Sequence, residues 1–412
     1  MAETGNPRLA AVALIGMSLV VACSPGRTAA PIPTAPSPTA PSTAPPVMSQ
    51  SPGPGRTTVT GSPEPSETAT GAVTASAAWA ATADANLTGS SALLDVAATG
   101  PRDAWAVGYK DSAEDREGTP AVLRWDGDRW REAPPVGDDA YHLEGVSAGG
   151  PDDVWVVGNG ESAFAAHWNG GRWQREKPFG VAEDYRLADV ATTGDATWFA
   201  ANAPAKAVVL EWDGKEFRTA LSTGGAFKAV TAKEGHIWAV GSSEKRTPLI
   251  WHGTAAGSWE APEIPEIPGG RLNRVWQISP SDVWAVGEVV NGPDDRAGRP
   301  LVLHRDGSGW SRVEVPVRLG TLRGVTAFGP DDLWISGIDA DHAGQALFLR
   351  FDGARWSREY GPLLRAHEED QQYEETDDVN HIGIARVPGT TTLWAVGSVG
   401  VGDDEEEFVL RR

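Results

Sequence analysis

Seven polar residues recur near the same point of a repeated sequence, and their chemistry differs from copy to copy. They are Asp95, Glu144, Asp189, Lys228, Asn273, Arg274 and Arg323. If the fold gathers them around one opening, their mixed charges could bind a small polar ligand. Two carboxylates roughly 5–10 Å apart could instead cleave a glycosidic bond. The charges could also pair with one another around water, so the residue types alone leave three interpretations open.

An aromatic residue stands beside this set. Trp276 occupies a position where other copies have a small or polar residue, such as Ala97 or Ser147. A tryptophan that faces a channel can serve as a stacking platform for a ligand. Packing in the local core is the alternative interpretation of the same residue.

Signatures of metal and nucleotide chemistry are weak by comparison. His142, His342, His367 and His381 lie in or beside loops of one face, but a transition metal would need several of them to converge. The acidic loop at about 364–380 could hold calcium, which prefers several carboxylate oxygens, or could be solvated surface. The chain has no EF-hand spacing, no metalloprotease motif and no phosphate-binding glycine loop. We therefore expect no cofactor, with calcium as the one candidate.

These residues belong to a repeat with the signature Asp-x-Trp-Ala-Val-Gly. Clear copies are Asp103–Gly108, Asp153–Gly158, Asp282–Gly287 and Asp332–Gly337, and looser copies surround Trp198, Trp238 and Trp394. Each copy holds short apolar runs separated by turn residues, and it recurs roughly every 45 residues, which is typical of a β-propeller blade. The pattern predicts an all-β fold of seven four-stranded blades. In this interpretation the tryptophan packs between blades and the aspartate shapes a turn.

The seventh copy is incomplete, because the chain stops after its third strand at 407–412. Upstream of the first copy, residues 75–82 contain Trp79 among small residues. We predict that this segment supplies the outer strand of the last blade, since closure of this kind leaves no broken blade. The alternative is that Trp79 belongs to the preceding linker.

Two parts of the repeat resemble kelch-type propellers, including the galactose-oxidase-like group. Trp105–Gly108 matches the aromatic-apolar-apolar-Gly strand of that pattern, and Trp125–Trp130 matches its Asp-led turn and second aromatic residue. The turn also resembles the Asp box of sialidase-like propellers, which has a serine two residues before its aspartate. At that place this chain has Arg124, His304 and Arg350. Neither resemblance implies an activity, because propellers host many unrelated functions.

The N-terminal region predicts a lipoprotein precursor. Residues 9–22 form an apolar stretch behind Arg8 that is too short to span a membrane but suits the core of a signal peptide. The stretch ends in Val20-Val21-Ala22-Cys23, which resembles the lipobox of bacterial lipoproteins, in which the cysteine carries the lipid. An ordinary secretory signal with a chance cysteine is the alternative.

These observations divide the chain into a signal peptide (1–22), a disordered linker rich in Pro, Ser, Thr and Ala (23–74) and a propeller (75–412). The net charge of −21 disfavours nucleic acid and anionic lipid as partners and favours a basic one. We expect a monomeric propeller, lipid-anchored at Cys23 on the extracytoplasmic side of the cell membrane. It would bind a protein or glycan through acidic, variable loops without catalysis. The alternative is a secreted glycan hydrolase or lyase with carboxylates at the channel mouth.

Overall fold

The computed structural model describes residues 79–82, 86–114, 116–177, 185–194, 196–290, 292, 298–364 and 378–412. The chain divides into two units, 1–68 and 69–412, and every described residue belongs to the second. The predicted signal peptide, the lipidation site Cys23 and the linker at 23–74 therefore lie outside the described residues. In the described ranges, no helix has the length and apolar character needed to cross a membrane.

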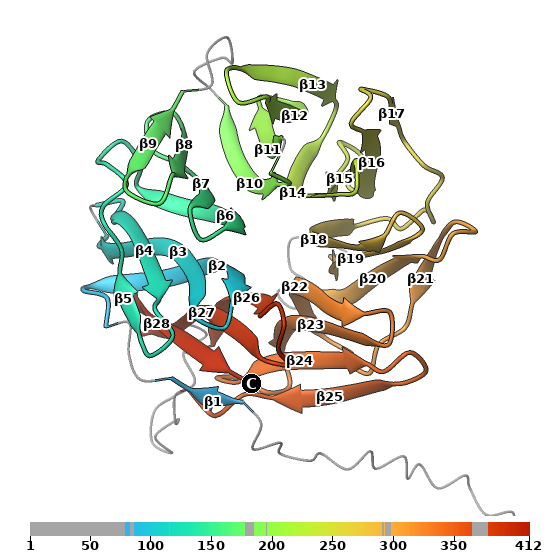
Figure 1. Ribbon diagram of the computed structural model, residues 1–412. Coiled ribbons are helices and arrows are strands. Elements are labelled where there is room, and N and C mark those ends of the chain that lie inside the picture. Colours follow the sequence, from blue (N-terminus) through green and yellow to red (C-terminus); the bar gives the residue numbers. More distant parts are fainter. Residues whose placement is uncertain are drawn as a thin grey trace, which may run out of the picture. The chain divides into compact units, whose positions relative to one another are not determined.

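The described residues form seven antiparallel sheets of four strands each, arranged as the blades of a ring (Figure 1). Blade 1 contains β2 (Ser90–Gly100), β3 (Asp103–Ser112), β4 (Thr119–Trp125) and β5 (Trp130–Glu132), and blade 2 contains β6 (His142–Gly150), β7 (Asp153–Asn159), β8 (Ala163–Trp168) and β9 (Trp173–Glu176). Blade 3 contains β10 (Arg186–Thr192), β11 (Thr197–Ala203), β12 (Lys206–Trp212) and β13 (Phe217–Thr223), and blade 4 contains β14 (Ala226–Lys233), β15 (His236–Ser242), β16 (Pro248–Thr254) and β17 (Trp259–Glu260). The fold is a seven-bladed β-propeller, as the repeat predicts.

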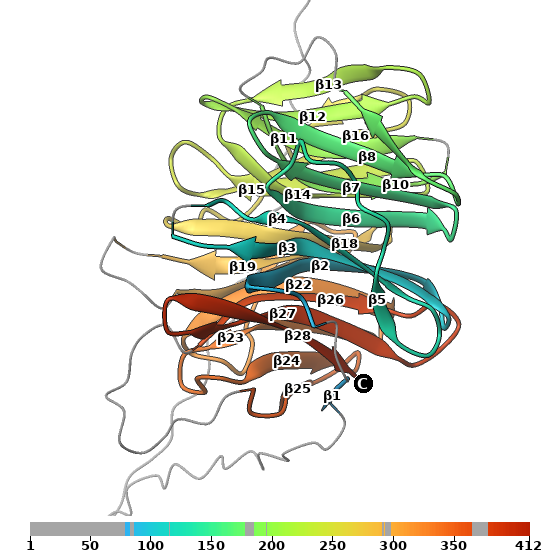
Figure 2. The same cartoon turned by 90° about the vertical axis from the view of Figure 1, so that its left-hand side faces the viewer.

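The remaining blades continue the same order around the ring. Blade 5 contains β18 (Gly270–Ser279), β19 (Asp282–Val289), β20 (Arg299–Arg305) and β21 (Trp310–Val313), and blade 6 contains β22 (Gly320–Gly329), β23 (Asp332–Asp339), β24 (Ala346–Phe351) and β25 (Trp356–Tyr360). Blade 7 contains β26 (Val379–Arg386), β27 (Leu393–Val401), β28 (Asp404–Arg411) and β1 (Ala80–Ala81). In every blade the first strand of the copy lies innermost (Figure 1), and Figure 2 shows the same blades from the side.

The last blade is closed by the N-terminal strand, which confirms the prediction made from Trp79. Ala80 pairs with Arg411 and Ala81 with Leu410, so β1 is the outer strand beside β28. Trp79, just before the strand, is buried, and its ring stacks on Phe348 of blade 6 with 3.6 Å between centroids. The first and last strands of the domain therefore share one sheet, and no blade is left incomplete.

The core consists of apolar wedges between neighbouring blades, not of a single centre. One wedge joins Trp105 and Val107 of blade 1 to Leu143, Val154 and Phe164 of blade 2. Large aromatic rings fill the space that opens between two twisted sheets. The second-strand tryptophans of the repeat are therefore packing residues, as the sequence indicates.

The aspartate of the repeat does more than shape a turn, which corrects the interpretation made from sequence. In blade 5, Asp282 accepts a hydrogen bond from Trp284 Nε1 at 3.0 Å and pairs with His304 at 2.9 Å. The His304 ring stacks on Trp284 with 3.8 Å between centroids. Arg124 and Arg350 form the same bridges to Asp103 and Asp332. The three residues that replace the Asp-box serine, two arginines and one histidine, thus each contact the repeat aspartate and lie over its tryptophan.

Candidate functional site

A β-bulge in the innermost strand brings the predicted site residues into the channel. In blades 1 to 6 the pairing with the second strand skips one residue at an equivalent point; in blade 2, for example, the skip falls between Leu143 and Gly145. The bulged residues are Leu94, Glu144, Ala188, Lys228, Asn273 and Arg323. A bulge interrupts the alternation of side chains, so consecutive residues of one strand can both line the channel.

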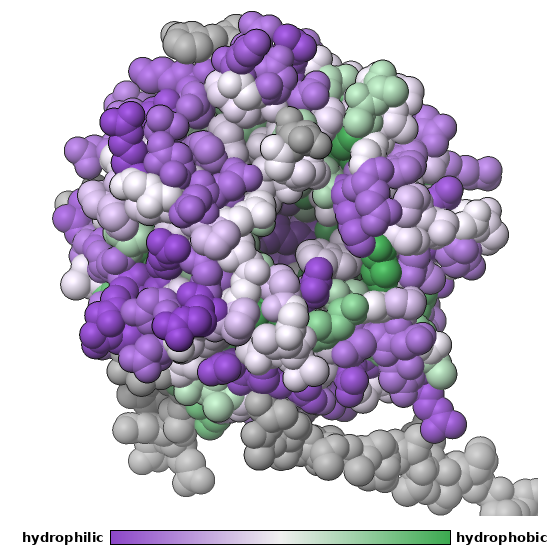
Figure 3. Space-filling view, in the orientation of Figure 1, coloured by the Kyte–Doolittle hydropathy of each residue, from purple (hydrophilic) through white to green (hydrophobic). Residues whose placement is uncertain are grey.

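All six bulged residues line one cavity of about 280 Å³, which we call the loop-side cavity. It lies where the inner strands begin. Four of the predicted residues, Glu144, Lys228, Asn273 and Arg323, are bulged residues that line it, and Arg274 also reaches its wall. Arg186 and His381 also line it, although the sequence did not single out Arg186. The hollow at the centre of the ring is visible from one face in Figure 3.

Cations outnumber carboxylates in the loop-side cavity. Burial alone would raise the pKa of Glu144, but the hydrogen bond from His142 and the charges of His142 and Lys228 lower it below its ordinary value. Arg323 is exposed to solvent, but the protein atoms around its side chain partly desolvate the guanidinium and so lower its pKa. Burial likewise lowers the pKa of His381. With Arg186, Lys228 and Arg323 set against Glu144, this mouth is positive in a chain whose net charge is −21.

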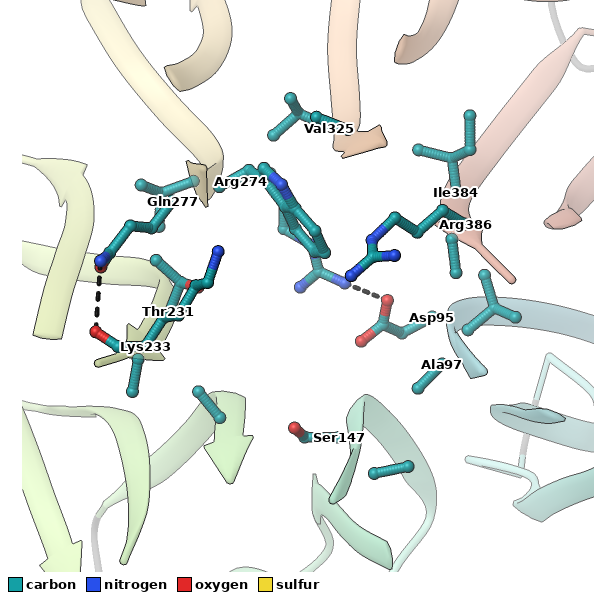
Figure 4. Close-up of a pocket in the computed structure, with 18 of the residues that line it drawn as sticks. Asp95, Ala97, Ser147, Thr231, Lys233, Arg274, Gln277, Val325, Ile384 and Arg386 are labelled. Carbon is teal, nitrogen blue, oxygen red and sulfur yellow. Dashed lines mark hydrogen bonds and ion pairs between the residues drawn. The ribbon is translucent and has the colours of Figure 1, made fainter. Parts of the chain in front are cut away.

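The other three predicted residues form a buried ion cluster in the next layer of the channel. Arg274 contacts the carboxylate of Asp95 (Figure 4) and that of Asp189, the latter at 3.1 Å. Asp95 also accepts from the backbone N–H of Val146, and Asp189 from that of Val230, both at 3.0 Å. The cluster therefore links five consecutive blades.

The layer that holds the cluster is otherwise built of small residues. At the equivalent positions the other blades have Gly145, Ala229, Gly324 and Gly383. A Cβ atom on Gly145 would lie 3.0 Å from the carboxylate oxygen of Asp189. Small residues in four blades thus make room for the charged side chains from the other three.

Burial dominates the electrostatics of the cluster. It raises the pKa of Asp95, and it raises that of Asp189 to about 6, although Arg274 acts in the opposite direction on both. Burial would lower the pKa of Arg274, but the charges of Asp189 and Asp95 keep it above its ordinary value. The guanidinium of Arg274 therefore stays charged and bridges the two buried carboxyl groups.

A second cavity of about 470 Å³ lies beyond the cluster, at the ends of the inner strands, and we call it the turn-side cavity (Figure 4). Arg274 lines both cavities, so the cluster marks the border between them. Trp276 lines the turn-side cavity and also packs against the core between blades 5 and 6. Trp276 therefore faces the channel and also packs in the core, and its role as a stacking platform stays a prediction.

The predicted residues do line the channel, but two further polar residues of the turn-side cavity, Gln277 and Arg386, were not among them. Both stand where the inner strand pairs with the residue before the second-strand tryptophan. The other copies have Ala98, Ala148, Thr192, Ala232 and Ala327 at this position. A long polar side chain among small ones was thus a signal that the sequence contained.

The acidic loops are described only in part. Asp294, Asp295 and most of the loop at 364–380 lie outside the described residues, as does His367. Among the residues that are described, no three His, Cys, Asp or Glu side chains form a group that could hold a metal ion. Calcium binding by these loops stays a prediction.

Comparison with known proteins extends to the fold. No family model and no curated protein matches the chain. YCF48 bound to D1 peptide is 16% identical with a TM-score of 0.52, over 81% of this chain and 94% of that one. The RRP9 WD40 repeats are 12% identical with a TM-score of 0.53, over 82% and 98%. A GH74 xyloglucanase from Xanthomonas campestris is 13% identical with a TM-score of 0.53, over 80% of this chain and 55% of the enzyme. These likenesses establish the propeller fold alone.

Proposed function

We propose that this protein is a non-catalytic binding module whose loop-side cavity holds an anionic group of a protein or glycan ligand. The observation that carries the proposal is the pair Lys228 and Arg323. Both line the cavity, and neither side chain forms a direct ion pair or hydrogen bond with another described residue, although the charge of Lys228 acts on Glu144. Cations without partners at a concave mouth are suited to a carboxylate or a similar group.

Glycan hydrolysis is supported less well than binding. The carboxylates that line the two cavities are Asp95, Glu144 and Asp189. Arg274 forms ion pairs with Asp95 and Asp189, and His142 pairs with Glu144 at 3.1 Å. A hydrolase needs one carboxyl group free to give a proton and another free to act on the opposite side of the bond. Paired carboxylates favour a structural or binding role instead.

The double variant Lys228→Gln/Arg323→Gln is expected to weaken ligand capture at least about tenfold, because a hydrogen bond to a charged group contributes about 1.5–3 kcal/mol. The measurement is retention of the full chain on an array of glycans and peptides with and without carboxylate groups. Lys206→Gln, at an exposed lysine that lines neither cavity, is the control. Equal retention of carboxylated compounds by the wild type and the double variant would refute the assignment.

The proposal includes a lipid anchor at Cys23, which rests on the sequence alone. Cells that express the wild type are expected to incorporate labelled fatty acid into the protein, and Cys23→Ala is expected to abolish the label. The thiol is the single one in the chain, so no other cysteine could take its place. Equal labelling of the two proteins would count against the anchor.

A further inference from the structure

The turn-side cavity has the composition of a second ligand site. Its volume of about 470 Å³ lies within the range of small-molecule pockets, and it combines apolar, hydroxyl and charged side chains. All seven inner strands contribute to its wall, so the surface is held by rigid elements and not by loops. We propose that this cavity binds a small organic carboxylate that carries a ring.

The ring would lie against Trp276. This residue projects far enough into the channel for Arg386 of blade 7 to reach it across blade 6, with the guanidinium carbon 6.0 Å from the ring centre. Small residues such as Ala97 and Ser147 stand at the equivalent positions of blades 1 and 2, which leaves open space beside the indole. A flat aromatic face next to open space is suited to stack a planar or ring-shaped molecule.

The carboxylate would bind Arg386. Both acids of the cavity are held by Arg274, and the ammonium of Lys233 donates to the carbonyl of Ile278 at 2.6 Å. Arg386 Nε, by contrast, is buried and has no hydrogen-bond partner among the described residues. In Figure 4 its guanidinium points into the cavity. An arginine without a partner beside an aromatic face is suited to a planar carboxylate, which it can bind through two parallel hydrogen bonds.

A second polar group of the cavity is also left unsatisfied. Gln277 is 2% exposed and donates through Nε2 to the carbonyl of Lys233 at 3.2 Å. Its Oε1 atom is buried without a partner among the described residues, although the side chain lines the cavity. A buried acceptor without a donor is costly, and a hydroxyl group of the ligand would satisfy it. The site therefore offers a stacking face, an anion binder and a hydrogen-bond acceptor.

The proposal is tested by calorimetric titration of the full chain with four probes. Glucuronate and benzoate carry both a ring and a carboxylate, glucose carries the ring alone and acetate the carboxylate alone. We expect saturable binding of at least one ring carboxylate and at least tenfold weaker binding of glucose and acetate. Binding of glucuronate would identify a saccharide acid as the natural class, and binding of benzoate an aromatic acid. Absence of saturable binding for both ring carboxylates would overturn the proposal.

Variants distinguish this site from the loop-side cavity. Arg386→Gln should weaken binding of the ring carboxylate at least tenfold. Trp276→Phe should weaken binding by a smaller factor than Arg386→Gln does. Arg305→Gln is the matched control. Arg305 also lies over a tryptophan, and its own Nε atom is likewise buried without a hydrogen-bond partner among the described residues, yet Arg305 lines neither cavity. If Lys228→Gln/Arg323→Gln loses the ligand and Arg386→Gln keeps it, the ligand sits in the loop-side cavity. That result would overturn this inference while supporting the proposed function.

Discussion

Arg274→Met is expected to lower the free energy of unfolding by about 3–5 kcal/mol, the largest effect of any single substitution in the channel. The substitution leaves Asp95 and Asp189 buried, close together and without their cation. An uncompensated buried charge costs more than the ion pair itself contributes, because the carboxylates cannot regain water. Urea unfolding of the full chain, followed by tryptophan fluorescence, measures the loss.

The pH dependence of this variant gives an independent check. Without Arg274, burial and mutual repulsion should raise the pKa of both aspartates further above their unfolded value of 3.8. A group whose pKa is raised in the folded state binds protons more tightly there, so the variant should regain stability as the pH falls from 7 towards 4. Wild type should regain less over the same window. A variant whose deficit stays constant across this range would show that the loss comes from packing and not from charge.

Two further variants complete this test. Asp95→Asn/Asp189→Asn in the Arg274→Met background removes both orphaned charges and is expected to restore part of the stability. Arg218→Met is the surface control, because Arg218 also bridges two acids, Asp213 and Glu216, but is exposed. Exposed ion pairs contribute little, so its unfolding curve should stay close to that of wild type.

Trp79→Ala is expected to destabilise the propeller by about 3–5 kcal/mol, the usual cost of removing a large buried aromatic side chain. Trp79 is 4% exposed, stacks on Phe348 and meets Trp334 edge-on at 6.2 Å. The loss should be local to the closure of the ring, so hydrogen exchange should rise first in β28 and β25. Urea unfolding and hydrogen exchange of the full chain measure the two effects.

Trp259→Ala is the matched control for the closure. Trp259 belongs to the short outer strand β17 of blade 4, is only partly buried and meets Trp198 edge-on at 6.3 Å. Removal of this side chain breaks no contact of the closing strand β1, so we expect a smaller loss of unfolding free energy than for Trp79→Ala and no change in hydrogen exchange at β28. Equal losses in the two variants would mean that the closing strand adds nothing beyond the burial of one tryptophan.

Much of the fold could be predicted because the repeat is a packing pattern. Tryptophan, small turn residues and short apolar runs return at a nearly constant spacing, and that spacing determines the number of blades. Even the incomplete copy was informative, since a missing strand at one end and a stray Trp79 at the other are complementary. The role of Asp282 was misjudged, because its partner His304 lies in the next strand and only the register places the two together.

The position of the candidate site in the channel could be predicted from the sequence, but the way its residues divide between two cavities could not. Asp95 and Glu144 stand at similar places in their copies of the repeat, yet Glu144 is a bulged residue and Asp95 is not, so they line different cavities. Bulges depend on backbone register, which side-chain alternation does not encode. The contact between Arg386 and Trp276 depends on the width of the channel across a third blade. No local pattern specifies that width.

The pairing of β1 with β28 also determines when the domain can complete its fold during synthesis. Its two strands lie about 330 residues apart, so β1 leaves the ribosome long before its partner exists. At roughly 10 residues per second, β1 waits about half a minute without a partner. During that interval blade 7 cannot form, and the wedges on both of its sides stay exposed. The ring can therefore close only after β28 has been synthesised, and a chain that lacks this strand would remain an open ring.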